Sequence, residues 1–448
     1  MASEELLDEI RDLIAERQER GIRGLADRLG PSDWADLLVR LDDDEVAILL
    51  ESIPDAEIPE ILEELDPENA AAILRLQPRE DAADLLEAID PDDATDILAE
   101  IPIEEAEQIL LAMEPEEAAE IRELSAYPPD TAGGRMTPAF VAISPEVRAD
   151  DAITLLRRVA EEAETIYYVY VLDEDEHLLG VLSLHNLVLT RSDTPVSAVM
   201  VADPIRVQAT ADQETAAELL VDHNLLALPV VDQEDRLLGI ITQDDVADVI
   251  EEETTEDFER LGGSQPLDTP YRFASAGLLV RRRIGWLLFL FLAGLLTSQV
   301  LQHYQERLEG VPALIPYIPL IIGIGGNVGS QTVTTLVRAI GVGEVRLSDV
   351  GWVLAKEMLV GLTVGLILGI VGYLRVGIPE GFQIGLVVGA TIVLVALWSA
   401  TVAAVLPLVL ERLGVDPAVV SAPLISTFVD ATGLLIYMTI AGLLLLQL

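Results

Sequence analysis

The sequence predicts a multidomain membrane protein with an all-α superhelical N-terminal domain, an α/β tandem pair, a connecting helix and a five-helix transmembrane domain. The distribution of charge indicates this division. Residues 1–270 carry 69 acidic and 17 basic side chains, whereas residues 271–448 carry 9 and 10. Regularly spaced prolines in the acidic part and five long apolar runs in the neutral part support it. We therefore expect an acidic soluble part followed by a membrane part.

The composition limits the classes of function. The chain has 448 residues, a formal net charge of −51 and no cysteine. Such an acidic surface repels phosphate backbones, which argues against nucleic acid and favours cations as partners. Disulfides, iron–sulfur clusters and thiolate zinc sites are excluded because all of them need cysteine. The N-terminus is amphipathic and acidic, so we predict no signal peptide and expect the chain to start in the cytoplasm.

Residues 1–126 are predicted to form an all-α solenoid-like domain. Apart from Pro59, the six prolines between residues 54 and 115 follow one another at alternating spacings of 13 and 11. Most open an acidic, Ala- and Leu-rich run such as Pro91-Asp92-Asp93-Ala94. Proline suits the first helical position, and acids suit the positive end of the helix dipole. The period of 24 therefore predicts stacked short helices, whose acids could also serve only for solubility.

Residues 127–193 and 194–252 repeat one pattern of strands and helices. Apolar runs alternate with amphipathic segments, and Leu-Leu-Gly at 178–180 recurs at 237–239. This tandem resembles a pair of CBS domains, which are regulatory modules that often bind adenine nucleotides. The resemblance implies a possible ATP site with Tyr168, Thr242 and Asp245. The first copy has Ser183 and Asn186 where the second has Thr242 and Asp245, and this missing acid weakens the nucleotide prediction.

Residues 253–283 are predicted to form a connecting helix between the tandem pair and the membrane. Six acids crowd residues 251–259. So dense a block of like charge is solvated or disordered unless a cation holds it.

Residues 284–448 contain five runs long enough to cross a bilayer, which takes about 20 apolar residues. The runs are residues 284–301, 312–340, 350–373, 384–410 and 418–446. An odd number of spans places the two ends on opposite sides. With the N-terminal domains in the cytoplasm and the C-terminus outside, eight basic side chains lie inside and two outside, as the positive-inside rule requires.

Polar residues within these runs indicate an ion pathway. Asp430 lies deep in the last run, where a carboxyl is costly and is by default a functional group that faces a cavity. Ser426 and Thr427 precede it by one turn. The second run contains prolines and a glycine-rich segment with Asn327 and Gln331 on one face, which we expect to be buried in protein or to line water. Packing between small residues would explain the glycines alone.

The motifs GGNVGSQ at 325–331 and DPAVVSAPLISTFVDATGLLIY at 416–437, together with the other domains, resemble the MgtE family of magnesium channels. The resemblance implies a homodimer in the cell membrane with one ion pathway, in which Asp430 holds hydrated Mg²⁺ and Asn327, Ser426 and Thr427 line the pore. It also implies cytosolic Mg²⁺-sensing ligands: Glu60, Asp92, Asp96, Asp212, Glu214, Asp245, Asp248, Glu253, Glu256, Asp257 and Asp416. Asn224 and Ala422 depart from the family pattern, at one sensory site and at the inner gate.

We therefore predict a homodimeric Mg²⁺-selective channel that mediates magnesium uptake and closes when cytosolic Mg²⁺ rises. Mg²⁺ prefers an oxygen shell and sheds water reluctantly, which suits one Asp per subunit with hydroxyl and carbonyl neighbours. Two alternatives remain: a proton-coupled divalent cation transporter that uses Asp430, and a membrane-tethered nucleotide sensor. No nucleophile–base pair or phosphate loop indicates an enzyme.

Overall fold

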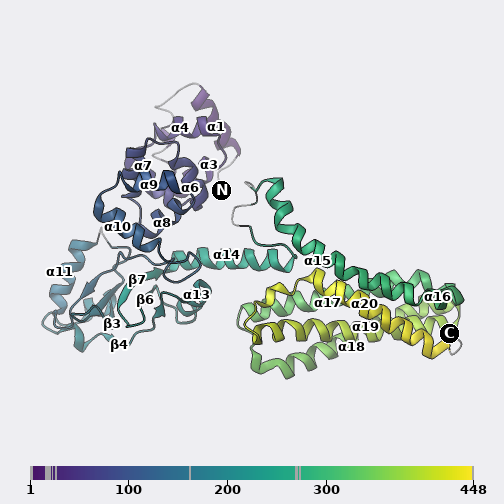
Figure 1. Cartoon of the computed structure of the whole chain (residues 1–448). Coiled ribbons are helices and arrows are strands. Elements are labelled where there is room, and N and C mark those ends of the chain that lie inside the picture. The colour runs from purple at the N-terminus through teal and green to yellow at the C-terminus, as the bar shows by residue number, and fades with distance from the viewer. Residues whose placement is uncertain are drawn as a thin grey trace. The chain divides into compact units, whose positions relative to one another are not determined.

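The computed structural model describes residues 4–15, 22, 24–25, 28–160, 163–267, 271 and 274–445. The chain divides into two compact units, Met1–Glu251 and Glu252–Leu448 (Figure 1). The first unit contains the helical domain and the tandem pair. The second contains the membrane helices.

The N-terminal domain is a stack of short helices around one apolar core. Alternate helices contact each other, so that α6, α8 and α10 follow one another in one row and α3, α5, α7 and α9 in another. The helices are α1 (Glu4–Ala15), α3 (Pro31–Leu38), α4 (Asp43–Leu50), α5 (Ile58–Glu63), α6 (Pro67–Leu74), α7 (Arg79–Leu86), α8 (Pro91–Ala99), α9 (Ile103–Leu110) and α10 (Pro115–Leu124), with the 3₁₀ turn η1 (Asp55–Glu57).

The prolines begin these helices as the sequence predicts. Pro67, Pro91 and Pro115 occupy the first helical positions of α6, α8 and α10. Pro78 and Pro102 are the N-caps of α7 and α9, one position earlier. This one-residue alternation sets the two helix rows apart, and both positions tolerate proline because its missing N–H would be unpaired there.

The tandem pair forms two small sheets, as expected for CBS domains. In the first sheet, β2 lies between a parallel β1 and an antiparallel β3, and β4 flanks β3. In the second, β6 lies between a parallel β5 and an antiparallel β7. The elements are β1 (Ala142–Ile143), α11 (Ala149–Val159), β2 (Tyr168–Leu172), β3 (Leu178–Ser183), α12 (Leu184–Leu189), η2 (Val196–Ala198), β4 (Val201–Ala202), β5 (Val207–Gln208), α13 (Gln213–Asp222), β6 (Ala227–Val231) and β7 (Leu237–Thr242).

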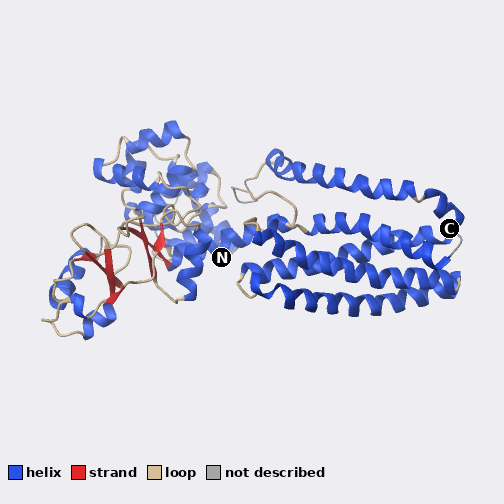
Figure 2. Ribbon diagram, turned by 60° about the horizontal axis from the view of Figure 1, so that its bottom comes forward, coloured by secondary structure: helices blue, strands red, loops and turns tan. Residues whose placement is uncertain are grey.

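The second unit contains five helices long and apolar enough to span a membrane (Figure 2). Helix α18 packs along α19, while α17 packs on both α19 and α20, and α15 contacts α20. The elements are α15 (Ala276–His303), α16 (Gln305–Gly310), η3 (Pro312–Tyr317), α17 (Ile318–Gly341), η4 (Leu347–Asp349), α18 (Val350–Glu380), α19 (Phe382–Arg412), η5 (Pro417–Val419) and α20 (Ala422–Leu445).

The glycine-rich segment of the second span is continuous helix within α17, and Gly325, Gly326 and Gly329 are buried against neighbouring helices, as expected. One element differs from the sequence expectation. The connecting helix, expected over 253–283, is α14 (Gln243–Leu261), which starts directly after β7, and α15 begins only at Ala276. Residues 268–270 and 272–273 of the expected helix lie outside the described part.

Candidate functional site

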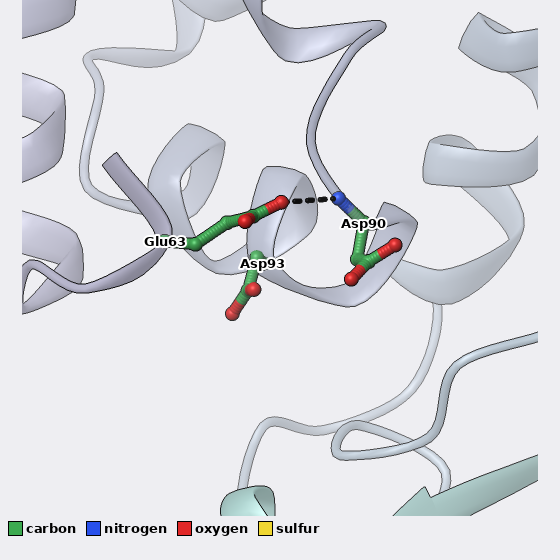
Figure 3. Close-up of side chains that lie close together, drawn as sticks. All are labelled: Glu63, Asp90 and Asp93. Atoms are coloured by element: carbon green, nitrogen blue, oxygen red, sulfur yellow. Dashed lines mark hydrogen bonds between the residues drawn. The ribbon is translucent and has the colours of Figure 1, made fainter. Parts of the chain in front are cut away.

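Three carboxylates of the helical domain converge at the start of α8 (Figure 3). Glu63 ends α5, Asp90 is the N-cap of α8 and Asp93 lies in its first turn. One oxygen atom of each lies within 4.8 Å of the other two, and the backbone N–H of Asp90 donates to Oε1 of Glu63 at 3.3 Å. Burial, followed by the charge of Asp90, raises the pKa of Glu63 to about 7. Burial, followed by the charge of Asp245, raises the pKa of Asp93 to about 8.

Acids of α8 and of both CBS domains extend this cluster. Burial and then the charge of Asp245 raise the pKa of Asp92 well above its usual range. Burial raises the pKa of Asp245 to about 6, although its carboxylate accepts hydrogen bonds from the N–H (2.8 Å) and hydroxyl (2.9 Å) of Thr242. Burial and then the charge of Asp90 raise the pKa of Glu164 to about 9. Burial is the largest cause of each shift, and the charges of neighbouring carboxylates add to it.

Asp92 bears most directly on cation binding. Its Oδ1 atom is buried and has no hydrogen-bond partner among the residues that the structure describes. A buried anionic oxygen without a partner is costly, so a hard cation is a suitable ligand for it. We call the carboxylates of Glu63, Asp90, Asp92, Asp93, Asp96, Glu164, Asp245 and Asp248 the upper junction.

The upper junction includes four of the predicted sensory residues, whereas Glu60, Asp212 and Glu214 lie outside it. Asp92, Asp96, Asp245 and Asp248 belong to it. Glu60 is exposed, one turn before Glu63, and contributes to the raised pKa of Glu63. Asp212 caps α13 by accepting from the N–H of Glu214 at 2.9 Å, and both side chains are exposed.

Asn224, one of the departures from the family pattern, has a local structural reason. Its φ of 50° is left-handed, directly after α13, where its N–H donates to the carbonyl of Val221 at 3.1 Å. Asparagine tolerates this conformation better than most residues.

A second group of acids lies at the other end of α14. Glu253, Glu256 and Asp257 lie there, and burial, followed by the charges of Asp416 and Glu253, raises the pKa of Asp257 to about 6. Arg260 pairs with both Glu256 and Asp416. Asp416 also accepts from the N–H of Ala418 at 2.7 Å and so caps the short helix η5. We call Glu253, Glu256, Asp257 and Asp416 the lower junction.

Asp430 lies in the middle of α20, partly buried. Its Oδ1 atom is buried without a hydrogen-bond partner among the described residues. Ser426, one turn earlier, faces Gly326 of α17, while the Thr427 hydroxyl donates to the carbonyl of Pro423 at 2.8 Å. Asn327 of α17 is exposed within this single chain.

Glycines allow α17 to approach its neighbours closely. A Cβ atom on Gly325 would lie 2.6 Å from Val429, and one on Gly329 would lie 2.5 Å from Ile425. The Ser399 hydroxyl of α19 donates to the carbonyl of Gly325 at 2.6 Å. Small-residue packing, the simpler explanation for these glycines, is therefore confirmed.

Glu357 and its neighbour Lys356 have different partners. The Thr332 hydroxyl of α17 donates to the carboxylate of Glu357 at 3.3 Å. The ammonium group of Lys356 instead lies over the ring of Trp352, 4.8 Å from its centre.

The three predicted nucleotide residues lie in three different elements, β2, β7 and α14. Tyr168 begins β2 and packs on the apolar cluster that includes Ala227 and Ile240. Thr242 ends β7, and its hydroxyl donates to Asp244 and Asp245. Thr242 and Asp245 are thus joined to each other at the edge of the upper junction.

Sequence reasoning missed Glu63, Asp90, Asp93 and Glu164. Glu63 follows the predicted ligand Glu60 by three residues, which places both on neighbouring positions of one helix. Asp93 adjoins the predicted ligand Asp92. These spacings were visible signals, whereas the position of Glu164 depends on the tertiary fold alone.

Comparisons with known proteins assign a family to each part of the chain. The family described as a divalent cation transporter matches residues 318–440, the MgtE intracellular N domain matches residues 29–130, and the CBS domain matches residues 132–192 and 196–252. The crystal structure of the cytosolic domain of the Mg²⁺ channel MgtE in complex with ATP is similar, with a TM-score of 0.52 and 35% identity. The similarity extends over 55% of this chain and 100% of the crystallised chain.

The matches define a membrane transporter for divalent cations that also contains a CBS pair. The magnesium transporter MgtE of Thermus thermophilus is 44% identical over 73% of this chain and 72% of that protein. The magnesium transporter MgtE of Enterococcus faecalis is 36% identical over 72% of this chain and 71% of that protein. The chain belongs to the MgtE family of magnesium transporters.

Proposed function

We propose that this protein is a Mg²⁺-selective channel that mediates magnesium uptake and closes when cytosolic Mg²⁺ rises. One observation carries the gating proposal: the single helix α14 carries acids of both junctions. Asp245 and Asp248 lie near its start, and Glu253, Glu256 and Asp257 lie near its end. Nineteen residues of helix extend about 28 Å, and we propose that this helix carries a displacement at one junction to the other.

The donor chemistry of the upper junction suits Mg²⁺. Every candidate ligand is a carboxylate, and Mg²⁺ takes one or two carboxylates while it keeps several waters. The raised pKa values of Asp92 and Asp93 show that the acids repel each other's charge. An ion that binds between α8 and the start of α14 would relieve this repulsion and hold the two domains together.

The lower junction would transmit this closure to the membrane helices. Asp257 of α14 and Asp416, before α20, lie close enough to repel each other. Mg²⁺ between them would hold the end of α14 beside the start of α20, the helix that carries Asp430. In the absence of ions, repulsion would release α14.

We place the ion-selecting site at Asp430, between two copies of the chain. Asn327 is exposed within one chain, as expected for a residue that lines a shared pathway. Two Asp430 carboxylates would offer a formal charge of −2 to a hydrated divalent ion. Monovalent ions would bind such a site weakly. The topology would place the N-terminal domains in the cytoplasm and the C-terminus outside.

Single-channel recording with a cytosolic Mg²⁺ titration tests both parts. The native channel should close as Mg²⁺ rises, and a variant with Asp92, Asp96, Asp245 and Asp248 changed to Asn should stay open. Asp430→Asn should abolish Mg²⁺ current, while Asp430→Glu should conduct with lower selectivity. Current that follows ΔpH rather than voltage would instead indicate proton-coupled transport, and an open probability unaffected by Mg²⁺ would refute the sensor.

ATP is a second proposed ligand, because the similar cytosolic domain was crystallised with it. Thr242 and Asp245 are the residues of this chain that we expect to contact the nucleotide. Since Asp245 also belongs to the upper junction, ATP and Mg²⁺ would influence each other's affinity. Equilibrium dialysis with ATP, compared between native protein and Thr242→Val, tests this proposal. Equal affinity in the two proteins would refute it.

A further inference from the structure

Arg135 lies in the segment between α10 and β1, and the second CBS domain holds the backbone of this segment in place. The N–H of Gly133 donates to the carbonyl of Ala209 at 2.9 Å. Thr137 and Ile240 exchange both backbone hydrogen bonds, at 2.8 and 2.9 Å. Arg135 therefore projects from a backbone that is hydrogen-bonded to the second CBS domain, although it belongs to the first CBS copy in the sequence.

The side chain of Arg135 reaches from this anchor to the helical domain. Its Nε donates to Oε1 of Gln213 in α13 at 2.9 Å, and its Nη1 donates to Oδ2 of Asp96 in α8 at 3.3 Å. The two charged side chains are only 17% and 27% exposed. One guanidinium group thus joins α8 to the second CBS domain across the upper junction.

Arg135 also differs in charge from its surroundings. Its positive charge opposes the rise in the pKa of Asp248, which burial and then Glu251 cause. The principal charges that act on Asp92, Asp93 and Asp245 are all negative within the described part of the chain. A partly buried ion pair is less screened by salt than an exposed one, and a planar guanidinium can hold two acceptors at fixed angles.

We propose that Arg135 is a built-in counter-cation of the upper junction, which holds Asp96 of α8 against the second CBS domain when divalent ions are absent. This inference rests on the proposed sensor function and adds to it. Arg135 neutralises the charge of Asp96 permanently, so Mg²⁺ has to bring together only the other acids of the upper junction. The ion-free junction then keeps a closed population, and Mg²⁺ shifts that population rather than assembling the junction from fully separated domains.

The test measures the distance between the two domains in the full-length chain. Because the native sequence has no cysteine, Glu80→Cys in α7 and Asp222→Cys in α13 provide two unique, exposed sites for spin labels. Labelled protein is diluted with unlabelled protein so that each measured pair lies within one chain. Distance distributions are recorded in EDTA and in 10 mM Mg²⁺ (roughly saturating for a millimolar sensor).

In EDTA, Arg135→Gln should lower the ratio of closed to open junction by roughly three- to fivefold relative to the native sequence. In saturating Mg²⁺ the two proteins should show the same distance. Arg135→Lys should recover part of the closed population because it keeps the charge but not the two-acceptor geometry. The matched control is Arg122→Gln, since Arg122 donates to the carbonyl of Ala118 in its own helix, and it should leave both distributions unchanged.

Each result separates this inference from the sensor proposal. If Mg²⁺ fails to narrow the distribution of distances between the two spin labels in the protein with native Arg135, the sensor proposal fails. If Mg²⁺ acts on the native protein but Arg135→Gln leaves the EDTA distribution unchanged, only the role of Arg135 fails. Should Arg135→Gln not fold, Asp96→Asn removes the same ion pair and should open the junction in EDTA, and an unchanged distribution would overturn the inference.

Discussion

The contact between α17 and α20 supports the helix that carries Asp430, and Gly329→Ala tests it. The added Cβ would lie 2.5 Å from Cγ2 of Ile425 and 2.6 Å from Oγ of Ser399. Ordinary contact begins at about 3.4 Å, so the helices must separate by nearly 1 Å, at a cost of about 1–3 kcal/mol. Displacement of Ser399 also weakens its bond to Gly325, worth about 1 kcal/mol. Because alanine has a higher helix propensity than glycine, the substitution also stabilises the helix by up to about 1 kcal/mol.

The net expectation is a loss of about 1–3 kcal/mol, seen as a melting temperature several degrees lower for purified full-length protein in detergent. Mg²⁺ flux into liposomes should fall in parallel, because α20 is displaced. Gly294→Ala is the matched control, since nothing lies within 4 Å of its added Cβ and alanine favours the helix. If both variants melt at or above the native temperature, the close packing of α17 on α20 is refuted.

Three further predictions concern the junctions. The fold raises the pKa values of the upper-junction acids above their unfolded values, so the folded protein should lose stability as the pH rises from about 4 to 9. The melting temperature in EDTA should show this decline, and saturating Mg²⁺ should suppress it. Glu63→Gln should raise several-fold the Mg²⁺ concentration at which half of the protein is protected from proteolysis, whereas Glu64→Gln, at the exposed neighbouring position, should leave it unchanged. The same half-protecting concentration in both variants would contradict this prediction. Arg260→Gln should speed cleavage after α14 in EDTA by freeing Asp416, while Arg236→Gln, in a hairpin ion pair, should have no effect; unchanged cleavage would remove Arg260 from the lower junction.

Much of the architecture follows from local rules that a sequence displays. Proline at the start of a helix needs no knowledge of the fold, because the restriction acts within one turn. The five spans are also local, since each depends only on the length and hydropathy of one run. Both predictions are confirmed. The boundaries of the connecting helix were harder to predict from the sequence, because helix propensity continues smoothly from Gln243 and no proline or glycine separates the second CBS domain from the linker.

The sequence by itself determined that the chain has an acidic soluble part and a neutral membrane part, and that cations are its expected partners. It could not determine which acids face one another. On a two-turn helix, acids point in several directions, and only the packing of α5, α8 and the start of α14 brings Glu63, Asp93 and Asp245 together. The same holds for Arg135, whose partners Asp96 and Gln213 are 39 and 78 residues away. Charge composition is a sum over residues, whereas a binding site depends on distances that long-range packing alone sets.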